Sequence, residues 1–164
     1  MVEVTRMTSA SIQEIKKELR TLNADVLQDF CMRLAKYKKE NKELLNYLLF
    51  EAHDERAYVD CVKEEIREMF AALPAGNLYY VKKSLRKILR FANRQIKYSG
   101  IRQTELGVRI FFCINMKEAK IPRPPGTVLF NLYQQQLKKI EGALDKLPED
   151  VRADYDRELK FILN

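Results

Sequence analysis

Apolar residues recur along this chain every three or four positions, and short polar interruptions separate one such stretch from the next. This spacing places apolar side chains on one face of an α-helix. The first stretch contains Ile12, Ile15, Leu19 and Leu22. Ser11 and Glu14 form a capping-box pattern, so we expect the first helix to begin at Ser11. Asn23 is the expected N-cap of a second helix, whose apolar positions run from Val26 to Tyr37.

The same signals divide the rest of the chain into further helices. A polar run at 38–41 precedes a short helix whose leucines we expect to be mostly buried. These leucines are Leu44, Leu45, Leu48 and Leu49. Caps and helix breakers then predict helices over about 54–73, 77–99, 103–119, 127–144 and 148–162. Proline and glycine interrupt helices, and they occur at each later break, most densely in the run 120–126.

The stretch 108–116 is ambiguous between helix and strand. It is rich in β-branched and aromatic residues, which suit a short strand as well as a buried helix. We favour a helix because Thr104 and Glu105 provide a start and no partner strand is evident. A helix that is apolar on most sides belongs in the middle of a domain.

Seven or eight helices joined by short loops predict an all-α fold in a single domain over residues 1–164. Consecutive antiparallel pairs occupy about 40 residues each, which is near the period of HEAT-type repeats. Stacked helical hairpins of this HEAT-like kind are the favoured arrangement, although no sequence self-similarity makes a repeat explicit. A compact helical bundle is the alternative.

Charge is distributed unevenly along the chain. The formal net charge is +7. The 36 consecutive residues between Glu68 and Glu105 contain eight basic residues and not a single acidic one. This segment therefore carries +8, and the remainder of the chain sums to −1. A cationic segment of this kind favours a polyanionic partner such as nucleic acid, or an acidic protein.

Most of these charges lie on the helix expected over 77–99. At about 100° per residue, five cations form one stripe opposite the apolar positions, and Arg86 lies beside it. The stripe consists of Lys83, Lys87, Arg90, Arg94 and Lys97. Tyr80, Phe91 and Tyr98 form an aromatic row along one border. These nine residues are the candidate ligand-binding site, where cations would neutralise phosphates and aromatic rings would stack on unpaired bases.

Three interpretations of the cationic stripe remain open. The simplest is a solvated helix face, partly neutralised by neighbouring acids. Asp60, Glu64 and Glu68 on the preceding helix lie opposite its apolar face, so both charged faces are expected to point outward. The other two interpretations are contact with nucleic acid through its phosphates and contact with an acidic partner protein. No motif for base-specific recognition is present.

The sequence contains no pattern that supports catalysis or a resident metal. His53 is the only histidine and lacks a suitably spaced partner. Asp54 is better explained as a helix cap, and Cys31 and Cys113 as small core residues, whereas Cys61 lies away from its helix's apolar face. Phosphate-loop and nucleophile motifs are absent too. We therefore expect a non-enzymatic binding protein without a metal or cofactor.

Cysteine usage and hydropathy bear on the compartment. Three widely spaced cysteines without a CxxC motif suit a reducing compartment. The N-terminal residues are polar and lack an apolar signal segment. The longest strongly apolar stretch, 108–116, is too short to span a bilayer. We expect a cytoplasmic protein with no membrane span, and the sequence leaves its oligomeric state open.

Overall fold

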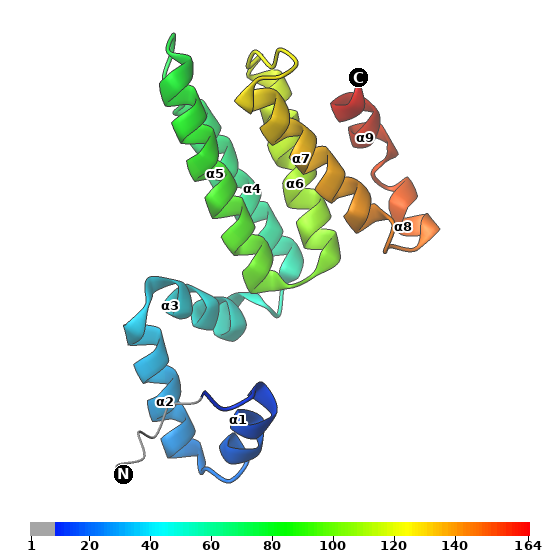
Figure 1. The fold of residues 1–164 in the computed structure, drawn as a ribbon. Coiled ribbons are helices and arrows are strands. Elements are labelled where there is room, and N and C mark those ends of the chain that lie inside the picture. The colour runs from blue at the N-terminus through cyan, green and yellow to red at the C-terminus, as the bar shows by residue number, and fades with distance from the viewer. Residues whose placement is uncertain (1–8) are drawn as a thin grey trace, which may run out of the picture. The chain divides into compact units, whose positions relative to one another are not determined.

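The computed structural model describes residues 9–164, and every regular element in that range is helical (Figure 1). The chain divides into two compact units, one ending at Asn46 and the other running from Tyr47 to Asn164. The first unit contains α1 (Ile12–Leu19), α2 (Ala24–Tyr37) and α3 (Lys39–Asn46). The second contains the π-helical turn η1 (Tyr47–Glu51), α4 (Glu55–Ala71), α5 (Leu78–Ser99), α6 (Arg102–Glu118), α7 (Val128–Leu144), α8 (Glu149–Ala153) and α9 (Asp156–Leu163). The prediction of an all-α fold is confirmed, whereas stacked hairpins and a single domain over 1–164 stay predictions.

Helix starts follow the capping residues expected from the sequence. At α1, the Ser11 hydroxyl accepts from the Glu14 amide at 3.3 Å, and the Glu14 carboxylate accepts from the Ser11 amide at 2.7 Å. Four other side chains accept a first-turn amide in the same way: Asn23, Asp54, Asn77 and Thr127. By contrast, α6 starts at Arg102 without a side-chain cap, as α8 and α9 also do, and Thr104 of α6 donates to Glu55 of α4.

The helix α6 is central to the second unit. It packs against α4, α5, α7 and α9, and ten of its residues are buried. In Figure 1 the α4–α5 pair lies on one side of α6 and α7 on another. Phe112 is fully buried and meets Phe70 of α4 edge-on, with ring centroids 5.4 Å apart. The stretch 108–116 is therefore a central helix rather than a strand, as expected.

One apolar face attaches α5 to this core. Its buried residues are Val81, Leu85, Ile88, Ala92 and Ile96. On the facing helix α4, the Tyr58 hydroxyl donates to the Gln95 side-chain oxygen at 2.7 Å and also contacts the Gln95 carbonyl at 3.2 Å. Burying a large aliphatic side chain contributes roughly 1.5–3 kcal/mol, so this face holds α5 firmly in place.

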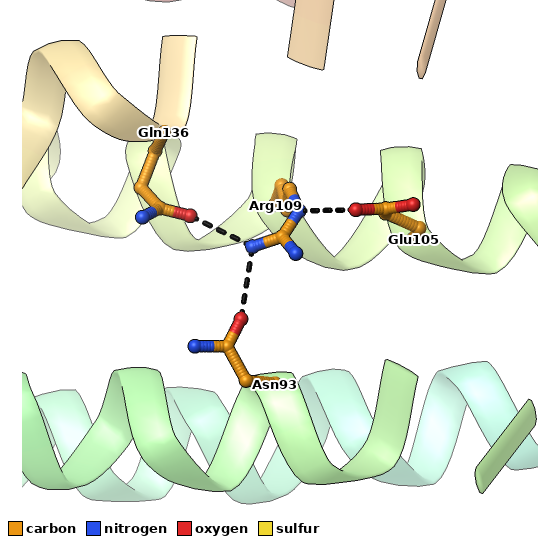
Figure 2. A network of polar contacts seen from close by, with 4 residues as sticks. All are labelled: Asn93, Glu105, Arg109 and Gln136. Carbon is orange, nitrogen blue, oxygen red and sulfur yellow. Dashed lines mark hydrogen bonds and ion pairs between the residues drawn. The ribbon is translucent and has the colours of Figure 1, made fainter. Parts of the chain in front are cut away.

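A buried polar network links α5, α6 and α7 (Figure 2). Arg109 of α6 donates from Nη1 to Asn93 of α5 at 3.0 Å and to Gln136 of α7 at 2.9 Å. Its Nε donates to Glu105, one turn earlier on α6, at 2.8 Å. A buried guanidinium is tolerated only when its charge and donors are matched, as they are here. The network therefore fixes how these three helices are aligned along their axes.

A second polar cluster joins the ends of three helices around Glu55. The Glu55 carboxylate accepts from Tyr47 of η1 at 2.7 Å and from Thr104 of α6 at 2.5 Å. It also accepts from the Ser99 hydroxyl at the last residue of α5. Because all of these partners meet one side chain of α4, the turn between α5 and α6 is held against the start of α4.

Three expectations need correction. Leu48 and Leu49 are exposed rather than buried, because the π-helical turn η1 changes the angular spacing of side chains after Asn46. Cys31 is exposed, whereas Cys113 is buried as expected. Cys31 differs because its unit has no buried side chain in α1, α2 or α3. The helix expected over 148–162 is divided into α8 and α9, so residues 9–164 contain nine α-helices, one more than the highest number expected.

Candidate cationic binding surface

The helix α5 is long and well defined at both ends. Asn77 accepts from the Tyr79 amide at its N-terminus at 2.9 Å. Gly100 ends it in the left-handed conformation, with φ of +67°, which glycine adopts without steric penalty. The 22 residues from Leu78 to Ser99 give a rigid rod of about 33 Å. Charges on its outer side are therefore held at fixed spacings.

The outer side of α5 carries the cationic residues predicted from the sequence. We call Lys83, Arg86, Lys87, Arg90 and Lys97 the cationic face, and all five are exposed. Arg94, which the sequence placed in the same stripe, is partly buried. Lys82, at the outer edge, is also partly buried, and Arg102 at the start of α6 is exposed. The structure thus presents five of the six predicted cations to solvent.

Acidic neighbours do not neutralise the cationic face. Asp60, Glu64 and Glu68 of α4 are exposed, and Glu64 pairs with Arg67 on its own helix. Across residues 9–164, no ion pair joins these three acids to the five residues of the cationic face. The expectation that the two charged faces point away from each other agrees with this geometry.

The three aromatic residues beside the cations differ in how far they are exposed. Tyr80 is 53% exposed, near the N-terminal end of α5. Phe91 and Tyr98 are partly buried, and Phe91 lines a hollow between α5 and α4. A ring must offer a free face to stack on a base. Of the three aromatic residues predicted, Tyr80 is the best placed for that role.

Sequence reasoning missed a second aromatic residue at this end of α5. Tyr79 is 65% exposed, and its ring meets that of Tyr80 edge-on with centroids 5.3 Å apart. Tyr79 precedes Lys83 by four residues, so both lie on the same side of the helix. This four-residue spacing in the sequence could have identified Tyr79 as part of the same surface. The two tyrosines together form an exposed aromatic pair next to the cationic face.

The hollow beside Phe91 contains the chemistry-bearing residues considered in the sequence. It has a volume of about 380 Å³, and its lining includes His53, Cys61 and Glu65, all three exposed. No hydrogen bond joins Cys61 to His53 among the described residues. Burial raises the pKa of Tyr58 in the same lining, so this phenol stays protonated at neutral pH. The hollow therefore shows no nucleophile paired with a base.

Within residues 9–164, no group of three or more His, Cys, Asp or Glu side chains is arranged to hold a metal ion. Over the same residues, none of the helices combines the length and apolar character needed to cross a bilayer.

Comparisons of the chain with protein-family models, curated proteins and solved structures found no match.

Proposed function

We propose that this protein is a non-enzymatic binding module that contacts nucleic acid through the cationic face of α5. The observation that supports the proposal most strongly is the set of five exposed cations on one rigid helix, with no ion pair to the acids of α4. Lys and Arg that neutralise phosphates release condensed counterions, which drives binding without sequence preference.

The repulsion among these cations supports a polyanionic partner. Like charges three or four positions apart on a helix destabilise it by about 0.2–0.5 kcal/mol per pair. Such pairs include Lys83 with Lys87, Lys83 with Arg86, and Arg86 with Arg90. The buried face of α5 offsets this repulsion in the free protein. A bound row of phosphates neutralises these cations and so removes their repulsion. The surface is therefore suited to bind a negatively charged partner.

The dimensions of the surface suggest how a nucleic acid lies on it. From Lys83 to Lys97 the helix extends about 21 Å at 1.5 Å per residue. That length allows contact with several consecutive phosphates of one strand. The exposed pair Tyr79 and Tyr80 lies at one end, where it offers stacking surfaces to unpaired bases. We therefore favour single-stranded nucleic acid over duplex.

The experiment that tests this proposal is a titration of fluorescent single- and double-stranded oligonucleotides at several salt concentrations. If three to five phosphates are contacted, log K should fall with log salt at a slope of roughly −3 to −4.5 for duplex, and somewhat less steeply for single strands. Absence of binding to either oligonucleotide at low salt would contradict the nucleic-acid proposal.

The second candidate is an acidic protein bound by the same cations, as part of an interaction scaffold. Polyaspartate serves as a probe that has the charge but lacks bases. Under the nucleic-acid proposal, a single strand of equal charge binds more tightly than polyaspartate, because only the nucleotide bases can stack on Tyr79 and Tyr80. Equal or tighter binding of polyaspartate would favour the acidic-protein function.

A further inference from the structure

The first unit exposes the apolar faces that its helices would be expected to bury. No side chain in α1, α2 or α3 is buried. On α2, Phe30 is 47% exposed, Leu34 60% and Tyr37 77%. The apolar positions of α1 are exposed as well, including Ile12 and Ile15. These two helices are amphipathic, and although α2 packs against α3, no side chain of either helix is buried by the described residues.

These exposed residues form a continuous groove between α1 and α2. The groove has a volume of about 760 Å³ and is lined mainly by Ile15, Leu19, Leu22, Phe30, Leu34 and Tyr37. Its charged lining residues are Glu14 and Glu18 of α1 and Arg33 of α2. Only the four residues 20–23 connect α1 to α2, and the apolar groove lies between the two helices.

A unit of this kind requires a partner for its stability. The unit runs only from Met1 to Asn46, and a single hydrophobic core in a domain of that size rarely supplies more than about 3–5 kcal/mol of stability. An isolated eight-residue helix such as α1 is also marginal in water. Covering the groove would bury the apolar side chains that now face solvent.

The exposed area matches what a dimer buries. With about 200 Å² for each fully exposed large side chain, Ile12 and the groove residues leave about 700 Å² of mostly apolar surface per chain. Two copies would bury about 1,400 Å² together, which lies within the range of about 1,200–2,000 Å² for stable protein interfaces. Phe30 and Tyr37 supply aromatic anchors of the kind that dominate such interfaces.

The charges at the edge of the groove favour a second copy of this chain as the occupant. A twofold interface brings each surface patch against the same patch of its partner. Because the charged lining residues of α1 are acidic and that of α2 is basic, a partner copy that sets its α1 against α2 brings opposite charges together. A groove edge of a single sign would instead repel its own copy.

We infer that the groove between α1 and α2 is a homodimer interface, in which two such helix pairs form a four-helix bundle. Helix pairs with short connections associate in this way around a shared apolar core. A dimer also presents two cationic faces, which increases avidity for one nucleic-acid strand. The inference itself does not depend on nucleic-acid binding, since apolar burial drives association and persists at high salt.

The test is the mass of the full chain in solution without nucleic acid. Light scattering coupled to size exclusion, at several protein concentrations and in high salt, should give twice the monomer mass of 19.4 kDa. The variant Phe30→Glu/Leu34→Glu should be monomeric, whereas Leu163→Glu, which changes an exposed leucine of α9, should remain dimeric. A monomer for the unaltered chain at every concentration would overturn the inference, as would an undisturbed dimer in the Phe30/Leu34 variant.

An exchange of two charges tests the same interface even where the Phe30/Leu34 variant fails to fold. Arg33→Glu should weaken dimerisation about tenfold or more, because it places like charges opposite each other. Adding Glu18→Arg should restore it, since the opposite pairing returns with the signs exchanged. Failure of the double variant to recover the dimer would contradict this arrangement of the two copies. Loss of nucleic-acid binding with the dimer intact would contradict only the proposed function.

Discussion

The Nη1 of Arg109 lies 2.9 Å from the side-chain oxygen of Gln136, and both residues are almost inaccessible, at 7% and 1% exposure. The same Nη1 reaches Asn93 of α5 at 3.0 Å (Figure 2). One guanidinium thus connects the helix that carries the cationic face to two others. The orientation of that face depends on a residue that has no direct part in ligand contact.

Replacing Arg109 with methionine should destabilise the protein by about 2–4 kcal/mol. The aliphatic volume is largely kept, but Gln136 and Asn93 lose their donor in a buried place, and unsatisfied buried groups cost about 1–3 kcal/mol each. Urea unfolding followed by far-ultraviolet circular dichroism measures this change. Arg157→Met on α9 is the matched control, because Arg157 is exposed, and it should change stability by about 0.5 kcal/mol or less. Equal stability of the two variants would contradict the structural role of Arg109.

Stability should decline at alkaline pH because buried acids must ionise. Burial raises the pKa of the Cys113 thiol from 9.0 to about 12, and burial also raises that of Tyr133 from 10.0 to about 12. A raised pKa in the folded state means that folding favours the neutral form, so this contribution is complete below pH 9. It is lost as pH rises towards about 12, because the unfolded chain ionises first.

Urea unfolding measured at intervals across this pH range tests the sign of the effect. The variant Cys113→Val lacks the thiol and should show a smaller loss of stability between pH 9 and 10 than the unaltered chain. A free energy of unfolding that stays constant or increases over that interval in the unaltered chain would show that the two groups ionise equally well in both states.

The sequence was sufficient to predict most of the helices and the side of α5 that faces solvent. Local signals determine both, since Asn77 and Gly100 mark the ends of α5 and the period of Val81, Leu85 and Ile88 defines its buried face. The partial burial of Arg94 and Phe91 could not be predicted, because it depends on neighbouring elements brought together by the fold. The exposure of Leu48 and Leu49 follows from a π-helical turn, for which the residue pattern gives no signal.

Reversing three charges of the cationic face should greatly weaken nucleic-acid binding without unfolding the protein. The variant Lys83→Glu/Lys87→Glu/Arg90→Glu should bind about 100-fold more weakly at low salt, because phosphates are then repelled from the surface. Its thermal stability should change little, since all three residues are exposed and form no ion pair among the described residues. Fluorescence anisotropy measures binding, and circular dichroism measures folding.

A control variant with the same net charge as this triple reversal distinguishes the effect of the charges on α5 from that of the protein's net charge. Lys138, Lys139 and Lys146 are exposed and lie in or just after α7 rather than on α5. Reversing these three should weaken binding far less than reversing the cationic face. Equal weakening in the two variants would mean that the net charge of the protein, and not α5, determines its affinity.

Removing the aromatic pair should affect single strands selectively. Stacking of a base on an aromatic ring contributes about 1–3 kcal/mol, so with one base stacked on the pair, Tyr79→Ser/Tyr80→Ser should weaken single-strand binding by about fivefold to 150-fold. Duplex binding should change little, because paired bases are not free to stack on these rings. The control Tyr79→Phe/Tyr80→Phe retains both rings and should bind single strands normally. An equal loss for single and double strands would contradict a stacking role.

The salt dependence of binding tests the contact between the cationic face and phosphates most directly. Replacing Lys83, Lys87 and Arg90 with glutamine removes three phosphate contacts and leaves uncharged side chains in their place. The slope of log K against log salt should then become less steep by about 2 for a single strand and by nearly 3 for duplex DNA. A slope identical to that of the unaltered protein, whatever the loss of affinity, would show that these residues do not contact phosphates.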